Sequence, residues 1–259
     1  MRMMKKVLGT VTVLALSASL LAGCGSTAAS PVSSAASTAA ESTTSSVVSE
    51  TTSAAADENV AAAAQLLNDL TGSYQELWPV ILADEYQQTW LDDCTALVGE
   101  ENAEAAFEKL SSMVTSDVYG EDAVEAYANG GGAYFCGFTN SLATLTFDGE
   151  TSTISGTDKD GNVLFSHTYH YIGMEPVRGL YEFESDDADS GEFTYFFLAP
   201  DTSAETYHIE FRYGSDAEAL SQYDAGEYAY WLASGISTDC DQTMIDNCIE
   251  LFCNENLAG

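Results

Sequence analysis

Basic residues are scarce in this chain, whose 259 residues include seven Lys and Arg against 41 Asp and Glu, for a formal net charge of −34. Three of the bases, Arg2, Lys5 and Lys6, lie at the start of the chain. The remainder keeps four bases against the same 41 acids, a formal charge of −37. A surface this negative repels nucleic acid and anionic lipid, and it attracts cations weakly and without selectivity. Acidity therefore argues against a nucleic-acid partner, but by itself it does not indicate a metal site.

The sequence motifs of common enzyme classes are also missing. There is no Gly-x-Ser-x-Gly nucleophile elbow, and Gly130-Gly131-Gly132 lacks the following Lys of a phosphate-binding loop. Carboxylates are abundant, but no pair stands out as a general acid and base. The sequence gives no support to an enzyme.

The N-terminus reads as a lipoprotein signal peptide over residues 1–23. A basic start is followed by the uncharged, mostly apolar run Val7–Ala22, which is short for a bilayer span, and by the lipobox Leu21-Ala22-Gly23-Cys24. Cleavage before Cys24 and diacylation of its thiol would tether the chain outside the cytoplasmic membrane, with only the lipid anchor in the bilayer. A plain secretory signal or a short membrane anchor is the alternative.

Five cysteines remain after Cys24, and none of them forms a Cys-x-x-Cys pair, so neither a thiolate zinc site nor a thioredoxin-like motif is indicated. An odd number outside the cell leaves at least one free or intermolecular thiol, or no disulfide at all. Cys248 has helical spacing with Met244, Ile245 and Phe252, which predicts a buried apolar role. The five are Cys94, Cys136, Cys240, Cys248 and Cys253.

Composition divides the rest of the chain into a tether and one domain. Residues 24–56 are rich in Ser, Thr and Ala, which cannot bury a core and predicts a disordered tether. Residues 57–259 are enough for one domain with a sizeable core. Helices are expected at Glu58–Leu70, within Trp78–Cys94, at Ala103–Val114 after an Asn102 cap, at Glu121–Ala128, at Asp216–Tyr223, and at Asp239–Cys253 after a Thr238 cap.

From Ala133 onward the apolar residues alternate with a period of two, which predicts strands joined by Asp-Gly turns. Six or seven consecutive antiparallel strands form a meander that can close into a small barrel, so the fold class is α+β, mainly β. The aromatic side chains on these strands are expected to be mostly core, or to line a ligand-binding barrel mouth. The expected strands are Leu142–Phe147, Thr151–Ser155, Val163–Ile172, Arg178–Ser185, Gly191–Leu198 and Glu205–Tyr213.

The last of these strands holds the best candidate site. Its alternation places His208, Glu210 and Arg212 on one face, opposite Ile209 and Phe211. An imidazole and a carboxylate two residues apart on one face have the spacing of two ligands of one metal ion. A half-buried strand with a polar outer face is the alternative.

Other polar groups are weaker candidates. Asp158-Lys159-Asp160-Gly161 resembles the start of a calcium loop, but the Gly and Glu that an EF-hand requires are absent further on, so a turn is expected. His167 and His170 are three apart on one strand and should point to opposite faces. At most one of them can line the interior.

Four segments occur in an order that resembles the ZinT family of zinc-binding proteins. They are LTGSYQELWPVIL at 70–82, the hairpin Tyr169–Gly173 with Arg178–Glu184, the His208 strand running into Gly214–Leu220, and the final helix from Asp239. The resemblance implies a lipocalin-like (calycin) antiparallel β-barrel with flanking N- and C-terminal helices. It covers nearly all of Leu70–Cys253.

The family binds zinc through three histidines, and the resemblance places their positions at Ala199, His208 and Glu210 of this chain. One ligand matches, one becomes a carboxylate and one is absent. Asp201, or His167 or His170 from the barrel interior, is the candidate for a third ligand, and His208 and Glu210 are expected to face the barrel cavity. The implied role is to scavenge zinc and deliver it to the solute-binding component of an ABC importer. The alternative is a degenerate member without metal that binds a small molecule or protein partner at the barrel mouth.

Overall fold

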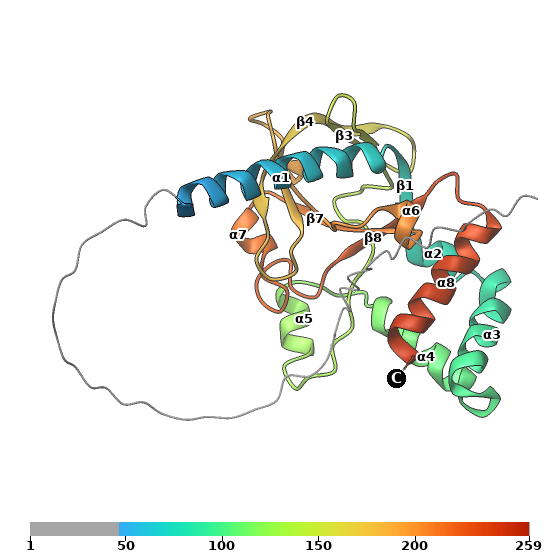
Figure 1. The fold of residues 1–259 in the computed structure, drawn as a ribbon. Helices are drawn as coiled ribbons and strands as arrows, with labels where there is room; N and C mark the ends of the chain where they lie inside the picture. The colour runs from blue at the N-terminus through green and yellow to red at the C-terminus, as the bar shows by residue number, and fades with distance from the viewer. Residues whose placement is uncertain (1–46, 259) are drawn as a thin grey trace, which may run out of the picture. The chain divides into compact units, whose positions relative to one another are not determined.

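Eight antiparallel strands close into a barrel in the computed structural model, which describes residues 47–258, with side chains from residue 58 onward (Figure 1). Each strand pairs with the next, and β8 returns to pair with β1. The closed barrel with helices before and after it confirms the predicted fold class. The strands are β1 Gly72–Glu76, β2 Thr144–Asp148, β3 Thr153–Thr157, β4 Val163–Met174, β5 Tyr181–Ser185, β6 Tyr195–Leu198, β7 Ile209–Gly214 and β8 Ala233–Ser237.

The two strands that close the barrel were not among those predicted. In β1, Tyr74 pairs with Leu145 of β2 on one side and with Ser237 of β8 on the other. Four of the five residues of β8 are buried, so this strand lacks the alternation that marks a half-exposed strand. The prediction of six or seven strands therefore omitted β1 and β8, whose pairing closes the sheet into a barrel.

The barrel interior is filled with aromatic side chains. Phe165 stacks on Phe193 with ring centroids 3.9 Å apart, and Tyr213 lies 5.3 Å from Phe196 and 5.0 Å from Trp231. Such ring pairs add to the burial of apolar area. The prediction that these aromatics are mostly core is confirmed.

The helices lie on the outside of this barrel (Figure 1). Helix α1 packs Leu66, Leu67 and Leu70 against the barrel core, whereas α2, α3, α4 and α8 share a second core with Ile236 of β8. The helices are α1 Val47–Asp69, α2 Leu77–Ile81, α3 Gln87–Val98, α4 Ala103–Val114, α5 Glu121–Ala126, α6 Ser203–Thr206, α7 Ala217–Leu220 and α8 Gln242–Leu257, with 3-10 turns η1 Asp84–Tyr86, η2 Glu100–Asn102 and η3 Gly191–Phe193.

The structure describes only part of the N-terminal region for which predictions were made. Helix α1 already begins at Val47, so the predicted domain boundary at residue 57 falls inside it. The predicted signal peptide, Cys24 and the first part of the tether lie outside the described residues. Within the part that is described, no helix is both long and apolar enough to cross a bilayer.

Two predicted helix caps are wrong. The Asn102 side chain donates to the carbonyl of Val98 (2.9 Å), at the end of α3, instead of capping α4. Helix α8 begins after Asp241, whose carboxylate accepts from the Met244 N–H (2.9 Å), so Thr238 is not its cap. Asn102 stands at the N-cap position of α4, but its side chain bonds to α3, whereas for α8 the error came from choosing among neighbouring Thr and Asp residues that are all good caps by type.

A buried arginine fixes the segment between α7 and β8. Arg212 of β7 is fully buried, and its guanidinium donates to the carbonyls of Leu220, Gln222 and Tyr228. Its Cζ also lies 4.4 Å from the centroid of the Tyr223 ring. Burial lowers the pKa of Arg212 to about 10. The segment therefore wraps around a cation that is solvated by the protein backbone.

We expect Arg212→Met to lower the free energy of unfolding by about 3 kcal/mol or more, because three buried carbonyls lose their donor at about 1–3 kcal/mol each. Chemical denaturation followed by tryptophan fluorescence measures this change. The control Lys159→Met removes a cation that is 82% exposed, and it should change the stability by less than about 0.5 kcal/mol. Equal effects of the two substitutions would contradict the anchoring role of Arg212.

Candidate metal centre

A tight turn precedes the strand that holds the candidate ligands. Helix α6 ends at Thr206, and Tyr207 takes a left-handed backbone conformation with φ of 66°. Strand β7 consequently begins at Ile209, four residues later than the predicted start at Glu205. His208 stands at the last position before the strand.

Two hydrogen bonds to Thr206 hold His208 in place. Nδ1 of the imidazole lies 2.7 Å from the carbonyl oxygen of Thr206, and the Thr206 hydroxyl donates to the carbonyl of His208 at 2.7 Å. A carbonyl oxygen can only accept, so Nδ1 carries the proton of the neutral ring. Nε2 is then the nitrogen with the free lone pair, which is how backbone carbonyls commonly orient a metal-binding histidine.

The free nitrogen faces the second candidate ligand. Nε2 of His208 lies 3.8 Å from Oε1 of Glu210, and the two side chains are 18% and 44% exposed. Two ligands about 2.1 Å from a tetrahedral zinc ion lie roughly 3.4 Å apart. A shift of a few tenths of an ångström would therefore let both side chains contact one ion, so this donor pair fits zinc.

The pair lies outside the barrel, which corrects the expectation that it faces the cavity. Ile209, Phe211 and Tyr213 point into the filled interior. Successive side chains of a strand point to opposite faces, so His208 and Glu210 lie on the outer face, at the boundary with the helices. Helix α8 approaches them there, and its Cys248 thiol acts on the pKa of His208.

Charge couples the two side chains. Burial alone lowers the pKa of His208, but hydrogen bonding to Cys248 and Glu210 outweighs it, and the pKa is raised well above 6.5. Burial alone raises the pKa of Glu210, but His208 and, more weakly, Arg178 outweigh it, and this pKa is lowered. In the metal-free protein the two side chains therefore form an ion pair.

Further acids lie close to this pair. Burial raises the pKa of Asp201, between β6 and α6, and that of Glu255 on α8, and the charge of Glu210 adds to both effects. Across the part of the chain that the structure describes, no three His, Cys, Asp or Glu side chains are already arranged to hold a metal ion. A third ligand would have to move in, and Cys248, Asp201 and Glu255, which act electrostatically on the pair, are candidates for that role. No sequence pattern indicated that Cys248 and Glu255 lie near His208.

Ala199, where the resemblance places the first histidine of the family, lies directly opposite Glu210. Its N–H donates to the carbonyl of Glu210 at 3.0 Å, continuing the β6–β7 register in which Leu198 pairs with Phe211. Residues directly opposite on antiparallel strands have Cβ atoms about 4.5–5.5 Å apart. A longer side chain at position 199 would therefore meet the Glu210 side chain.

The other two histidines do not join this site. His167 and His170 lie on β4, and they pair with Asp187 and Asp186, each through Nδ1 at 2.7 Å. His167 stacks near Phe165 in the barrel, whereas His170 is exposed on the outer face. Their opposite orientations are as predicted, but neither supplies the third ligand.

The predicted turn at Asp158 is present. The Asp158 carboxylate accepts from the N–H groups of Asp160 and Asn162, each at 2.9 Å, and from the Asn162 side chain. The bonds to Asn162 lower the pKa of Asp158. This carboxylate closes a turn.

Solved structures similar to this chain include two of one zinc-binding protein. The Zn(II)-bound ZinT-like domain of Streptococcus pneumoniae AdcA aligns with a TM-score of 0.45 and 15% identity, covering 71% of this chain and 89% of that domain. Zn(II)-bound AdcA from the same organism aligns with a TM-score of 0.42 and 15% identity, and only 34% of its length is covered. No family model and no curated protein sequence matches the chain.

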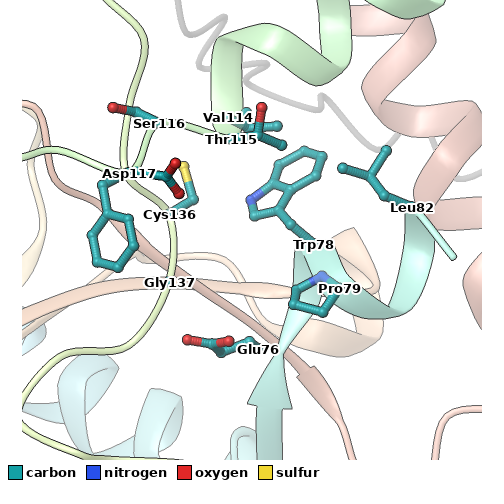
Figure 2. A pocket seen from close by; sticks show the side chains of 11 residues that line it. Glu76, Trp78, Pro79, Leu82, Val114, Thr115, Ser116, Asp117, Cys136 and Gly137 are labelled. Carbon is teal, nitrogen blue, oxygen red and sulfur yellow. The ribbon is translucent and has the colours of Figure 1, made fainter.

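A small cavity lies among β1, α2, the end of α4 and residues 135–137. It has a volume of about 300 Å³, and Trp78, Asp117 and Cys136 meet across it (Figure 2). The indole N–H of Trp78 is buried and makes no hydrogen bond there. Burial, followed by the charge of Glu210, raises the pKa of Cys136 to about 12. The remaining lining residues are Glu76, Pro79, Leu82, Val114, Thr115, Ser116, Phe135 and Gly137.

We expect Glu210→Gln to lower the pKa of His208 in the metal-free protein, because the substitution removes a negative partner of the imidazolium. NMR titration of the imidazole measures the change, and the exposed acid Glu100, replaced by Gln, is the control. A raised folded pKa stabilises the fold below about pH 6.5, and this contribution disappears as the pH rises through the raised value. If the stability of the Glu210→Gln variant depends on pH in the same way as that of the Glu100→Gln control, the ion pair is contradicted.

Proposed function

We propose that this chain is a lipid-anchored protein outside the cytoplasmic membrane that binds zinc through His208 and Glu210 and delivers it to an ABC importer. The observation that supports this most directly is the orientation of His208. Its Nδ1 bonds to a backbone carbonyl, so Nε2 is the nitrogen available to a metal, and Nε2 faces a carboxylate at 3.8 Å. The lipobox ending at Cys24 supports the location.

The chemistry of the donors favours zinc over calcium or magnesium. Calcium and magnesium prefer oxygen ligands, whereas imidazole suits zinc, copper, iron and nickel. The Cys248 thiol beside His208 adds a soft donor within reach. With one nitrogen, one carboxylate and one thiol or further carboxylate, the site would have three protein ligands and one open position.

An open site on the outside of the barrel suits a protein that gives up its metal. Glu210 is 44% exposed, so an importer component could approach that side of the ion. The resemblance to ZinT proteins implies the solute-binding component of an ABC importer as the recipient. The acidic surface would raise the local concentration of cations without selecting among them.

The cavity of about 300 Å³ supports a second candidate function, the binding of a small molecule or a protein side chain. The unpaired indole N–H of Trp78 is a donor for such a ligand. The barrel-mouth aromatics predicted for this role instead pack on one another in the barrel core. This function would not depend on His208.

Zinc binding by the chain from Gly25 onward, without a histidine tag, tests the proposal. We expect one zinc ion per chain with a submicromolar dissociation constant in equilibrium dialysis. His208→Ala should weaken binding at least about tenfold, because it removes the nitrogen ligand. His170→Ala, which removes a histidine on β4, should leave the affinity unchanged. Equal loss in both variants, or none in either, would refute a centre at His208 and favour the small-molecule function.

We expect Ala199→His to increase zinc affinity at least about tenfold, because a histidine opposite Glu210 supplies the missing third ligand. The same dialysis experiment measures the gain. Ala199→Leu is the matched control, since it adds a side chain of similar bulk without a donor atom. If the two variants bind zinc alike, Ala199 does not adjoin the metal centre.

A further inference from the structure

Two buried cysteines face each other between helices α3 and α8. Cys94 on α3 and Cys253 on α8 are both completely buried, and their sulfur atoms lie 4.0 Å apart. The two helices pack directly on each other, and Trp90 of α3 meets Phe252 of α8 edge to face, with ring centroids 6.0 Å apart. Well-packed neighbours therefore hold the two thiols in contact.

We propose that Cys94 and Cys253 are an oxidisable pair that forms a disulfide linking α3 to α8. A disulfide requires the sulfur atoms to approach to about 2.05 Å, so they must come closer by roughly 2 Å. Rotation about the two Cα–Cβ bonds moves sulfur atoms over such distances.

The surroundings of the other cysteines favour this pairing. The Cys136 thiol donates to the carbonyl of Tyr134 at 3.9 Å and lines the cavity, and Cys248 lies beside His208. Cys240 is only partly buried and precedes α8. The pairing leaves these three as free thiols, which accounts for the odd number of cysteines in the domain.

The reaction requires an oxidant that itself contains a disulfide, such as oxidised glutathione. The thiolate of Cys94 attacks one sulfur of the oxidant, forming a mixed disulfide and releasing one glutathione thiolate. The thiolate of Cys253 then attacks the Cys94 sulfur and releases the second glutathione. The two protein thiol protons end on the two glutathione molecules, which have taken up the two electrons.

Burial determines when this reaction can occur. It raises the pKa of both Cys94 and Cys253, so the folded protein holds both groups as unreactive thiols. Oxidation therefore takes place while the chain folds, before the two helices exclude the oxidant. Once formed, the disulfide is protected from reductants by the same packing.

The link would also affect the candidate metal centre, because α8 carries Cys248 and Glu255 beside His208. Joining α8 to α3 fixes the helix that covers the candidate ligands. The disulfide itself does not require metal binding, so the two proposals are tested separately.

The test refolds the full chain carrying Cys24→Ser in a buffer of reduced and oxidised glutathione, followed by alkylation of free thiols and intact mass measurement. We expect one disulfide and three alkylated cysteines, with proteolysis yielding a linked peptide pair that contains Cys94 and Cys253. The oxidised form should unfold at a higher denaturant concentration than the reduced form.

Cys94→Ala should abolish both the mass change and the stability difference, whereas Cys136→Ala should preserve them. The peptide map of the otherwise unsubstituted chain decides the matter if a variant fails to fold. Five alkylated cysteines after refolding, or a linked peptide containing a different cysteine, would overturn the proposal.

Discussion

A closed sheet forces each strand to divide its side chains between one shared interior and an outer face, and the candidate site depends on this division. In β7 the interior positions hold Ile209, Phe211 and Tyr213, which pack among the rings of the barrel core. The polar side chains of His208 and Glu210 are thereby directed outward. Any metal chemistry at this strand must consequently take place between the barrel and the helices, where α8 lies over the sheet.

Polar groups on this outer face are stabilised in two different ways. Arg212 is fully buried, and backbone carbonyls solvate its charge. His208 and Glu210 are less buried and neutralise each other. The Arg212 arrangement has no room for a ligand, because the guanidinium donors already bond to carbonyls of the segment before β8. The second is open, because Glu210 is partly exposed, and under the proposed function a cation would replace the imidazole proton and bind the carboxylate.

The sequence predicted most strands and most helices, because strong alternation and helical spacing are local signals. It missed β8, which is buried on both faces, and the left-handed turn at Tyr207, where non-glycine residues rarely adopt positive φ. It also missed the proximity of Cys248 to His208, since helix α8 and strand β7 are distant along the chain. Which face of a closed barrel a strand turns inward depends on packing among all strands, so the outward orientation of His208 was not accessible from local pattern.

The seam between β1 and β8 has a consequence for how the molecule is made. Its partners, residues 74–76 and 235–237, come from opposite ends of the barrel sequence, so β1 emerges during synthesis long before its second neighbour exists. Barrels with such non-local pairing fold slowly, and the unpaired edges of β1 and its early neighbours stay open to other chains meanwhile. The strong negative charge of the chain provides mutual repulsion during this interval. Strand β1 therefore reaches its native environment only after the last quarter of the polypeptide has been made.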